Sequence, residues 1–265
     1  PFQPPANGVS VETISQFIDL LAQAKSPLVV LGGSGWDEAS VASFSAFAER
    51  FALPVAVEFR RQTLISADHP GYAGDLSLSA DPKLKQRLSD ADLLILVGGQ
   101  FSDIASQAFT LVGIPTPQMK LVHVHPDPNE LGHLYRADLA VVASPKAFAR
   151  ALDGVKPAGK PAWGDAAAVA HADALAYADP TRTHSPGALQ MAYIMQAIGE
   201  HLPQDAIICN GAGNYAIWVH RFHRYRSWGS QLAPTSGSMG YGLPASVGAK
   251  AAQPARTVVA FSGDG

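Results

Sequence analysis

The sequence has 265 residues, which is enough for about two packed domains. Its formal net charge is −3, so it lacks the broad positive field that attracts a nucleic acid backbone or an anionic membrane. No apolar run approaches the roughly 18 residues needed to cross a membrane, and the first ten residues lack the pattern of a signal peptide. We therefore expect a soluble protein that binds neither nucleic acids nor membranes.

The low proportion of charged residues bears on how much of the surface is covered by other domains or subunits, and the single cysteine bears on the cellular compartment. Charged residues make up 15% of the sequence, whereas about 25% is usual. Two explanations stay open: surface covered by other domains or subunits, which is poor in Lys, Glu and Asp, or an alanine-rich protein with ordinary exposure. Cys209 fits a reducing compartment, so we expect a cytoplasmic protein in which this residue is a small buried hydrophobe.

The first 155 residues combine a short linker with an alternating strand and helix pattern. Residues 1–10 are rich in helix breakers and are expected to be a linker arriving from a missing upstream domain. In residues 11–155 short apolar runs alternate with helical patterns, which predicts one open α/β domain. Helices are predicted over 38–51, 82–88 and 127–135. The predicted buried parallel strands are 28–31, 55–57, 93–97, 121–124 and 139–142.

A second α/β unit is predicted after a break in this pattern. Residues 156–184 contain several prolines around an alanine-rich stretch that resembles a partial helix, and we expect an interdomain linker there. The unit at 185–265 ends on a strand that runs into Gly-Asp-Gly without the helix that would cover it, as in a truncated domain. Its predicted elements are a helix at 187–201, a strand at 206–209, helices near 215–222 and 240–252, and a strand at 257–261.

Two glycine-rich turns of the second unit stand at the carboxyl ends of predicted strands, where open α/β sheets bind ligands. In the turn at 210–215, glycines let backbone N–H groups approach a phosphate oxygen. In Gly263-Asp264-Gly265 a carboxylate between glycines is suited to a hard cation that prefers oxygen ligands. Either turn alone is a weak signal, because glycine turns after strands are common.

The stretch between these turns carries a more specific pattern. Residues 237–244 read Gly-Ser-Met-Gly-Tyr-Gly-Leu-Pro, and Met239 stands 25 residues before Asp264. This arrangement resembles the diphosphate-binding domain of thiamine-diphosphate-dependent enzymes of the acetolactate synthase type. Residues 92–99 and 123–132 are similar to the central domain of that family. The resemblance implies two open, mostly parallel sheets flanked by helices: a DHS-like Rossmann-type central domain, then a truncated thiamine-diphosphate-binding domain.

The resemblance implies a set of cofactor ligands. Asp264 would bind Mg²⁺, and the backbone of Gly263 and Gly265 would line the diphosphate site. Met239 would wedge under the cofactor and hold its two rings in a bent shape, a role suited to a long unbranched thioether. The Met239 N–H and the Gly237 carbonyl would grip the aminopyrimidine ring. The residues that would hold diphosphate oxygens are Ala212, Gly213, Asn214 and Tyr215.

The same resemblance implies decarboxylation of a 2-keto acid such as pyruvate and ligation of the product to a second carbonyl compound, as in a transferase or lyase. It further implies a homodimer or homotetramer in which a glutamate from the upstream pyrimidine-binding domain of a partner subunit activates the cofactor. That glutamate, and an asparagine expected beyond Gly-Asp-Gly, are outside these 265 residues. We therefore expect this chain alone to be inactive.

Two rival functions stay open at the level of sequence. One is an FAD- or NAD-binding oxidoreductase built on Gly32-Gly33-Ser34-Gly35, although the dinucleotide pattern fails because residue 38 is Glu. The family resemblance allows FAD in the central domain, but Gln100 stands where an arginine is usual. The other rival is a non-catalytic nucleotide-binding module.

Three smaller groups of residues have a structural and a functional interpretation each. His123 and His125 alternate on one strand and could pair on a metal, but no third ligand is in view. The basic stretch 220–226 could clamp an anion or form a solvated or subunit-facing helix end. Arg60 and Arg61 could face the active-site entrance or form surface salt bridges.

Overall fold

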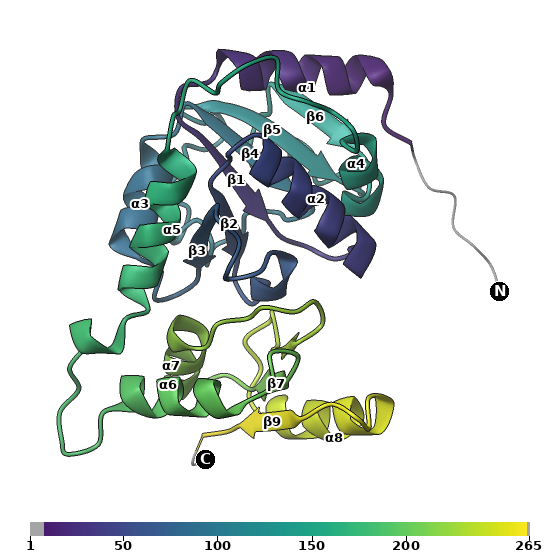
Figure 1. Ribbon diagram of the computed structural model, residues 1–265. Coiled ribbons are helices and arrows are strands. Elements are labelled where there is room, and N and C mark those ends of the chain that lie inside the picture. Colours follow the sequence, from purple (N-terminus) through teal and green to yellow (C-terminus); the bar gives the residue numbers. More distant parts are fainter. Residues whose placement is uncertain (1–7, 264–265) are drawn as a thin grey trace.

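The computed structural model describes residues 8–263, which form two α/β units (Figure 1). The first unit contains a six-stranded, fully parallel sheet with strand order β3-β2-β1-β4-β5-β6. Parallel pairing with the order reversing between β1 and β4 is the arrangement of a doubly wound nucleotide-binding sheet. The strands are β1 (Pro27–Leu31), β2 (Val55–Glu58), β3 (Tyr72–Leu76), β4 (Leu93–Val97), β5 (Lys120–His125) and β6 (Leu139–Val142).

Helices cover both faces of this sheet, because alternate strand residues point to opposite sides. On one face Val29 and Leu31 pack with aromatic rings from α1 (Val11–Gln23), α2 (Glu38–Arg50) and α4 (Pro145–Ala151). On the other face Leu28 and Val30 pack with α3 (Pro82–Ser89) and α5 (Ala166–Tyr177). The five strands predicted from apolar runs are present. Four of them are buried on both faces as expected, whereas β6 at the edge of the sheet exposes Ala140 and Val142.

Helix starts follow their capping residues. The Asp37 side chain accepts a hydrogen bond from the Ser40 N–H, and the Ser40 hydroxyl accepts one from the Asp37 N–H, which closes a capping box at the start of α2. Asp81 caps α3 in the same way through the Lys83 N–H. The helix predicted at 127–135 was wrong, because this segment forms consecutive turns. Prolines flank its start and Gly132 adopts a positive φ of 84°, which breaks a helix.

The second unit is smaller. Its parallel sheet has the order β8-β7-β9, from β7 (Ile207–Asn210), β8 (Gln231–Leu232) and β9 (Val258–Phe261). Helices α6 (Met191–His201) and α7 (Tyr215–Phe222) pack on the Ile208 side of β7, and α8 (Gly242–Ala252) packs on the Cys209 side. Cys209 is fully buried, and burial raises the pKa of its thiol to about 11.

The segment between the units is more ordered than a linker. Residues 156–184 contain α5, which packs on the sheet face that carries β3, and a short 3₁₀ turn (Pro180–Arg182) follows it. Figure 1 shows α5 running along the first unit and leading down to the second. A second 3₁₀ turn (Gln62–Leu64) follows β2. Among residues 8–263, no helix is long and apolar enough to cross a membrane.

The two units meet through side chains that follow β2. Gln62 and Gln231 form two hydrogen bonds with each other. The backbone N–H of Gln62 donates to the Gln231 side-chain oxygen at 2.9 Å, and the Gln231 side-chain NH₂ donates to the Gln62 side-chain oxygen at 2.8 Å. At the rim of the contact, Asp68 accepts from Arg224 at 2.5 Å and from Arg226 at 2.8 Å. These contacts fix how the first unit faces the glycine-rich turns of the second.

Candidate functional site

A cavity of about 610 Å³ lies at the carboxyl ends of β7 and β9. Both glycine-rich turns and the stretch that follows Met239 contribute to its wall. Segments that are distant in sequence therefore meet at one site, as the sequence predicts for a ligand at strand ends. The lining residues are Gly211, Ala212, Gly213, Asn214, Tyr215, Met239, Gly240, Gly242, Leu243, Pro244, Ser262 and Gly263.

Glycine is required where two backbone segments cross at the floor of this cavity. A Cβ atom on Gly242 would lie 2.9 Å from both the Asn210 carbonyl carbon and the Gly211 nitrogen. Only a residue without a side chain lets the first turn of α8 approach the end of β7 so closely. Gly213 has a φ of 148°, which few other residues adopt, and it turns the chain from β7 into α7.

Two helix N-termini open onto the cavity without side-chain caps. Asn214 stands at the N-cap of α7 and Tyr241 at that of α8, and neither side chain accepts a hydrogen bond from its helix. The first N–H groups of a helix lack intrahelical partners and carry the positive end of the helix dipole. Two such ends at one cavity form a site for an anion such as a diphosphate.

The Tyr215 side chain is engaged within the protein. Its hydroxyl accepts a hydrogen bond from the Gly211 N–H at 2.9 Å and donates one to the Phe261 carbonyl at 3.1 Å. It thus ties the end of β7 to the end of β9. Only the backbone N–H of Tyr215 is left to face an anion, which refines the role that the sequence suggested.

The other predicted residues fall into three groups. Met239 and Gly263 line the same cavity, and the Met239 residue is 73% exposed. Gly237 lines an adjoining cavity of about 220 Å³ together with Ala212, Gly213 and Asn214. Asp264 and Gly265 lie outside the described residues, so the geometry of the expected metal ligand is not part of the described site.

Arg60 links the first unit to two segments of the second, the turn at 210–215 and the stretch that contains Pro234. It follows β2 with a left-handed φ of 59° and is 6% exposed. One terminal nitrogen donates to the Pro234 carbonyl, and the other donates to the Gly211 carbonyl at 3.3 Å. The guanidinium also lies 4.5 Å from the centre of the Phe59 ring. Arg60 is therefore a buried link between the units and not a surface salt bridge, and Arg61 lines the cavity at the carboxyl edge of the first sheet.

Comparison with known families agrees with this geometry. Residues 14–152 match the family profile described as "Thiamine pyrophosphate enzyme, central domain". Residues 211–265 match that of "Thiamine pyrophosphate enzyme, C-terminal TPP binding domain". The chain belongs to the thiamine pyrophosphate enzymes. The family resemblance and the α/β fold expected from the sequence are thereby confirmed.

Curated relatives of this thiamine pyrophosphate enzyme include the acetolactate synthase isozyme 2 large subunit of Escherichia coli K12, 27% identical over 95% of this chain and 44% of that protein. The acetolactate synthase large subunit of Lactococcus lactis is 26% identical over 96% of this chain and 44% of that protein. The sulfoacetaldehyde acetyltransferase of Castellaniella defragrans is 26% identical over 93% of this chain and 45% of that protein. The chain thus spans less than half the length of these relatives.

The carboxyl edge of the central-domain sheet carries a cavity of about 480 Å³. The Glu58 carboxylate accepts a hydrogen bond from the Phe101 N–H at 2.7 Å, and burial raises the pKa of this group. A Cβ atom on Gly32 would lie 1.9 Å from the Glu58 Oε2 atom, and one on Gly99 would lie 2.2 Å from it. The Glu58 carboxyl thus occupies the space beside Gly32 and Gly99, and neither matched family profile supports the dinucleotide alternative.

The basic stretch at 220–226 holds the two units together. Arg221 lies 3.8 Å over the Tyr177 ring and donates to the Tyr177 carbonyl, while Arg224 and Arg226 bind Asp68. The stretch therefore matches neither a solvated helix end nor an anion clamp.

The two histidines at the start of this stretch and on β5 are structural in the described chain. The His220 ring bonds the Asn210 side chain at 3.2 Å, and burial lowers the His220 pKa to about 3. His123 bonds the Gly99 carbonyl at 2.9 Å. Within residues 8–263 no group of three or more His, Cys, Asp or Glu side chains is arranged to hold a metal ion.

Proposed function

We propose that this protein catalyses thiamine-diphosphate- and Mg²⁺-dependent decarboxylation of a 2-keto acid such as pyruvate, with ligation of the product to a second carbonyl compound, as in acetolactate synthase. The observation that carries the proposal is the meeting of two uncapped helix N-termini at one cavity of about 610 Å³. The membership of residues 211–265 in the thiamine-binding domain family supports it. The names of the relatives support the choice of reaction.

The residues around the cavity fit the diphosphate of the cofactor. The N-terminus of α7 borders the glycine-rich lining of the cavity, and the helix dipole there favours negative charge. We assign the diphosphate oxygens to the backbones of five residues of the two turns and the metal ion to the Asp264 carboxylate. The five are Ala212, Gly213, Asn214, Tyr215 and Gly263, and Gly265 belongs with them by its place in the sequence.

Met239 and Gly237 are assigned to the organic part of the cofactor. The Met239 side chain is exposed to the cavity and flexible enough to fill the gap beneath two rings. When bound, thiamine diphosphate supplies the electron sink that allows the bond to the carboxylate carbon to break. The protein contributes position: the Met239 N–H and the Gly237 carbonyl orient the aminopyrimidine, and the apolar Met239 side chain excludes water from beneath the rings.

Assembly and location complete the proposal. We assign the protein to the cytoplasm as a homodimer or homotetramer, with the pyrimidine-binding domain of a partner subunit supplying the activating carboxylate. Two of the relatives are named large subunits, which supports assembly with other chains. Light scattering of the purified full-length protein measures the subunit number. A strictly monomeric protein with full activity would contradict this part.

Calorimetry tests the cofactor assignment directly. Thiamine diphosphate titrated into the full-length protein is expected to bind with Mg²⁺ present and at least tenfold more weakly with the metal chelated. The variant Asp264→Ala should bind the cofactor weakly in both conditions, whereas the exposed control Asp153→Ala should behave as wild type. Binding that is indifferent to Mg²⁺ and to Asp264 would overturn the proposal.

A further inference from the structure

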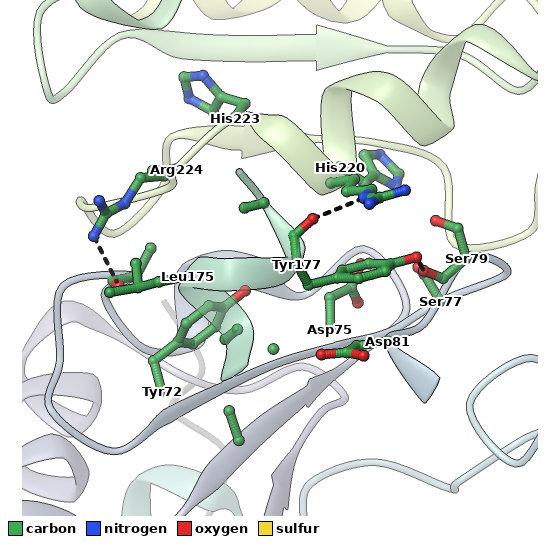
Figure 2. A pocket seen from close by; sticks show the side chains of 16 residues that line it. Tyr72, Asp75, Ser77, Ser79, Asp81, Leu175, Tyr177, His220, His223 and Arg224 are labelled. Atoms are coloured by element: carbon green, nitrogen blue, oxygen red, sulfur yellow. Dashed lines mark hydrogen bonds between the residues drawn. The ribbon is translucent and has the colours of Figure 1, made fainter. Parts of the chain in front are cut away.

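A smaller cavity of about 60 Å³ lies between the two units and shares no lining residue with the cavity of about 610 Å³. Figure 2 shows its walls: side chains from β3 and α5 on one side, and from the end of α7 and the residues after it on the other. Its volume accommodates a few water-sized groups. Asp75, near the end of β3, is the residue on which the inference depends.

The Asp75 carboxylate is buried without a hydrogen-bond donor. Each of its two oxygens exposes less than 1 Å², and neither has a hydrogen-bond partner among the described residues. The Ser77 hydroxyl lies nearby without the geometry of a hydrogen bond. A buried carboxylate with no donor is costly, and native proteins pair such groups almost without exception. The pattern therefore points to a donor that enters the cavity.

The terminal nitrogens of the arginines around the cavity bond other groups, while the buried Nε atoms of Arg60 and Arg224 have no partner among the described residues. Arg221 donates to the Tyr177 carbonyl and to the Thr183 hydroxyl, and Arg224 binds Asp68. Arg60 is close enough to influence Asp75 electrostatically, but its terminal nitrogens bond the second-unit carbonyls. None of these guanidinium groups donates a hydrogen bond to Asp75 in the described chain.

The remaining wall suits a small cation with N–H donors. The Tyr72 and Tyr177 rings line the cavity, and aromatic faces attract ammonium groups. Arg221 already lies 3.8 Å over the Tyr177 ring, so we assign the Tyr72 ring to the ligand. The Tyr177 hydroxyl is fixed by its hydrogen bond to the Ser79 carbonyl at 2.7 Å, and Asp81 adds a second carboxylate to the wall. The rest of the wall consists of small and apolar side chains from β3 and α5 and of His220, Arg221, His223 and Arg224 from the second unit. It does not offer the many oxygen ligands that a bare divalent cation needs.

We propose that this cavity binds a small ammonium group, with the Asp75 carboxylate as its hydrogen-bonding counter-ion. The ligand is an ammonium ion, or the ammonium end of a molecule with a few non-hydrogen atoms. The site lies at the junction of the two units and includes residues of both, so occupancy stabilises their docked arrangement. The site shares Ser77, Ser79 and His220 with the cavity of about 220 Å³ and no lining residue with the cavity of about 610 Å³. The proposed binding does not rest on the reaction assigned to the cofactor.

The binding is linked to pH through Asp75. Burial raises the pKa of this carboxyl to about 8, so at neutral pH a proton competes with the ligand. A methylammonium ion keeps its own proton beyond this range. Its affinity therefore rises as the pH increases from 7 to 9. The other titratable or charged groups that face Asp75 or the cavity are Arg60 after β2, Tyr72 on β3, Asp81 before α3, Tyr177 on α5, His220 and Arg221 on α7, and His223, Arg224 and Tyr225 after it.

Thermal unfolding and calorimetry of the 265-residue chain with methylammonium chloride test the proposal. Potassium chloride at the same ionic strength controls for screening, and tetramethylammonium chloride tests the need for an N–H donor. The wild-type melting temperature is expected to rise with methylammonium alone, and affinity measured by calorimetry is expected to fall at least tenfold in Asp75→Asn. The exposed variant Asp153→Asn should keep the wild-type response.

A second variant keeps the test decisive if Asp75→Asn folds poorly. Ala174→Leu leaves the carboxylate in place and fills the cavity from α5, so it should lose the methylammonium response. Equal stabilisation by all three salts, or an unchanged response in either cavity variant, would overturn the proposal. A response to potassium as strong as that to methylammonium would show a cation site without ammonium recognition, which also contradicts it.

Discussion

The guanidinium group of Arg60 donates a hydrogen bond of 3.3 Å to the backbone carbonyl of Gly211, a residue 151 positions further along the chain. The same side chain bonds the Pro234 carbonyl, so one residue of the central domain holds two segments that border the candidate cofactor site. This contact makes the placement of the diphosphate turn depend on how the two units dock.

We predict that Arg60→Ala weakens both docking and cofactor binding. The change removes one of two donors from each carbonyl, since Gly211 also accepts from the Asn210 side chain and Pro234 also accepts from the Gly237 N–H. We expect a cost of about 1–3 kcal/mol in the free energy of unfolding. Urea unfolding measures this loss, and calorimetry should show thiamine diphosphate affinity reduced about tenfold in the full-length protein. Arg150→Ala, at an exposed position of α4, is the matched control and should change neither quantity. Unchanged cofactor affinity would show that the site does not depend on this contact.

Tyr215→Phe should reduce stability and leave catalysis largely intact. The lost hydroxyl bridges Gly211 and Phe261, so the variant is expected to lose about 1–3 kcal/mol. Because we assign only the backbone of residue 215 to the diphosphate, the kcat of the folded full-length variant should stay close to the wild-type value. Tyr193→Phe on α6, which is 48% exposed, serves as control. A large fall in kcat without loss of stability would show that the hydroxyl acts on the cofactor itself.

Gly242→Ala and Gly248→Ala form a pair on one helix with opposite expected effects. A Cβ atom on residue 242 would press on backbone atoms of β7 at 2.9 Å, whereas one on residue 248 meets open space. The first change should cost about 1–3 kcal/mol and displace the start of α8 from the cavity. The second should stabilise α8 by about 0.5–1 kcal/mol. Equal melting temperatures for the two variants would contradict this account of the cavity floor.

Two histidines at the junction predict a loss of stability in acid. Burial lowers the pKa of His220 to about 3 and that of His223 to about 4, from an ordinary value of 6.5. The unfolded chain takes up protons on both below about pH 6.5 while the folded chain does not, so the free energy of unfolding falls as the pH drops from 6.5 to 4. Urea unfolding across this range should give a smaller slope for His223→Gln and the wild-type slope for the exposed His184→Gln.

The sequence predicted the strands that bury both faces, because uninterrupted apolar runs leave few alternatives. It missed β3, whose glycine and Asp75 interrupt the apolar run, and it placed a helix at 127–135 where prolines and a glycine favour turns. In the second unit it predicted the two glycine-rich turns and their meeting point, because the carboxyl ends of parallel strands share one edge.

Contacts between the units were beyond reach of the sequence. Nothing local to Arg60 or Gln62 shows that their partners are more than 150 positions away. Asp75 likewise carries no pattern that predicts its burial. Such residues depend on the docked geometry of two units, which hydrophobic periodicity does not encode.

The pair of hydrogen bonds between Gln62 and Gln231 contributes uncharged contacts to the inside of the junction, while the ions of Asp68, Arg224 and Arg226 stand at its partly exposed rim. Dissolved salt screens exposed charges and has little effect on hydrogen bonds between buried neutral groups. A higher ionic strength should therefore weaken the ion pairs at the rim of the junction before it weakens the hydrogen bonds inside it. The two units would stay aligned through the buried contacts of Gln62 and Arg60.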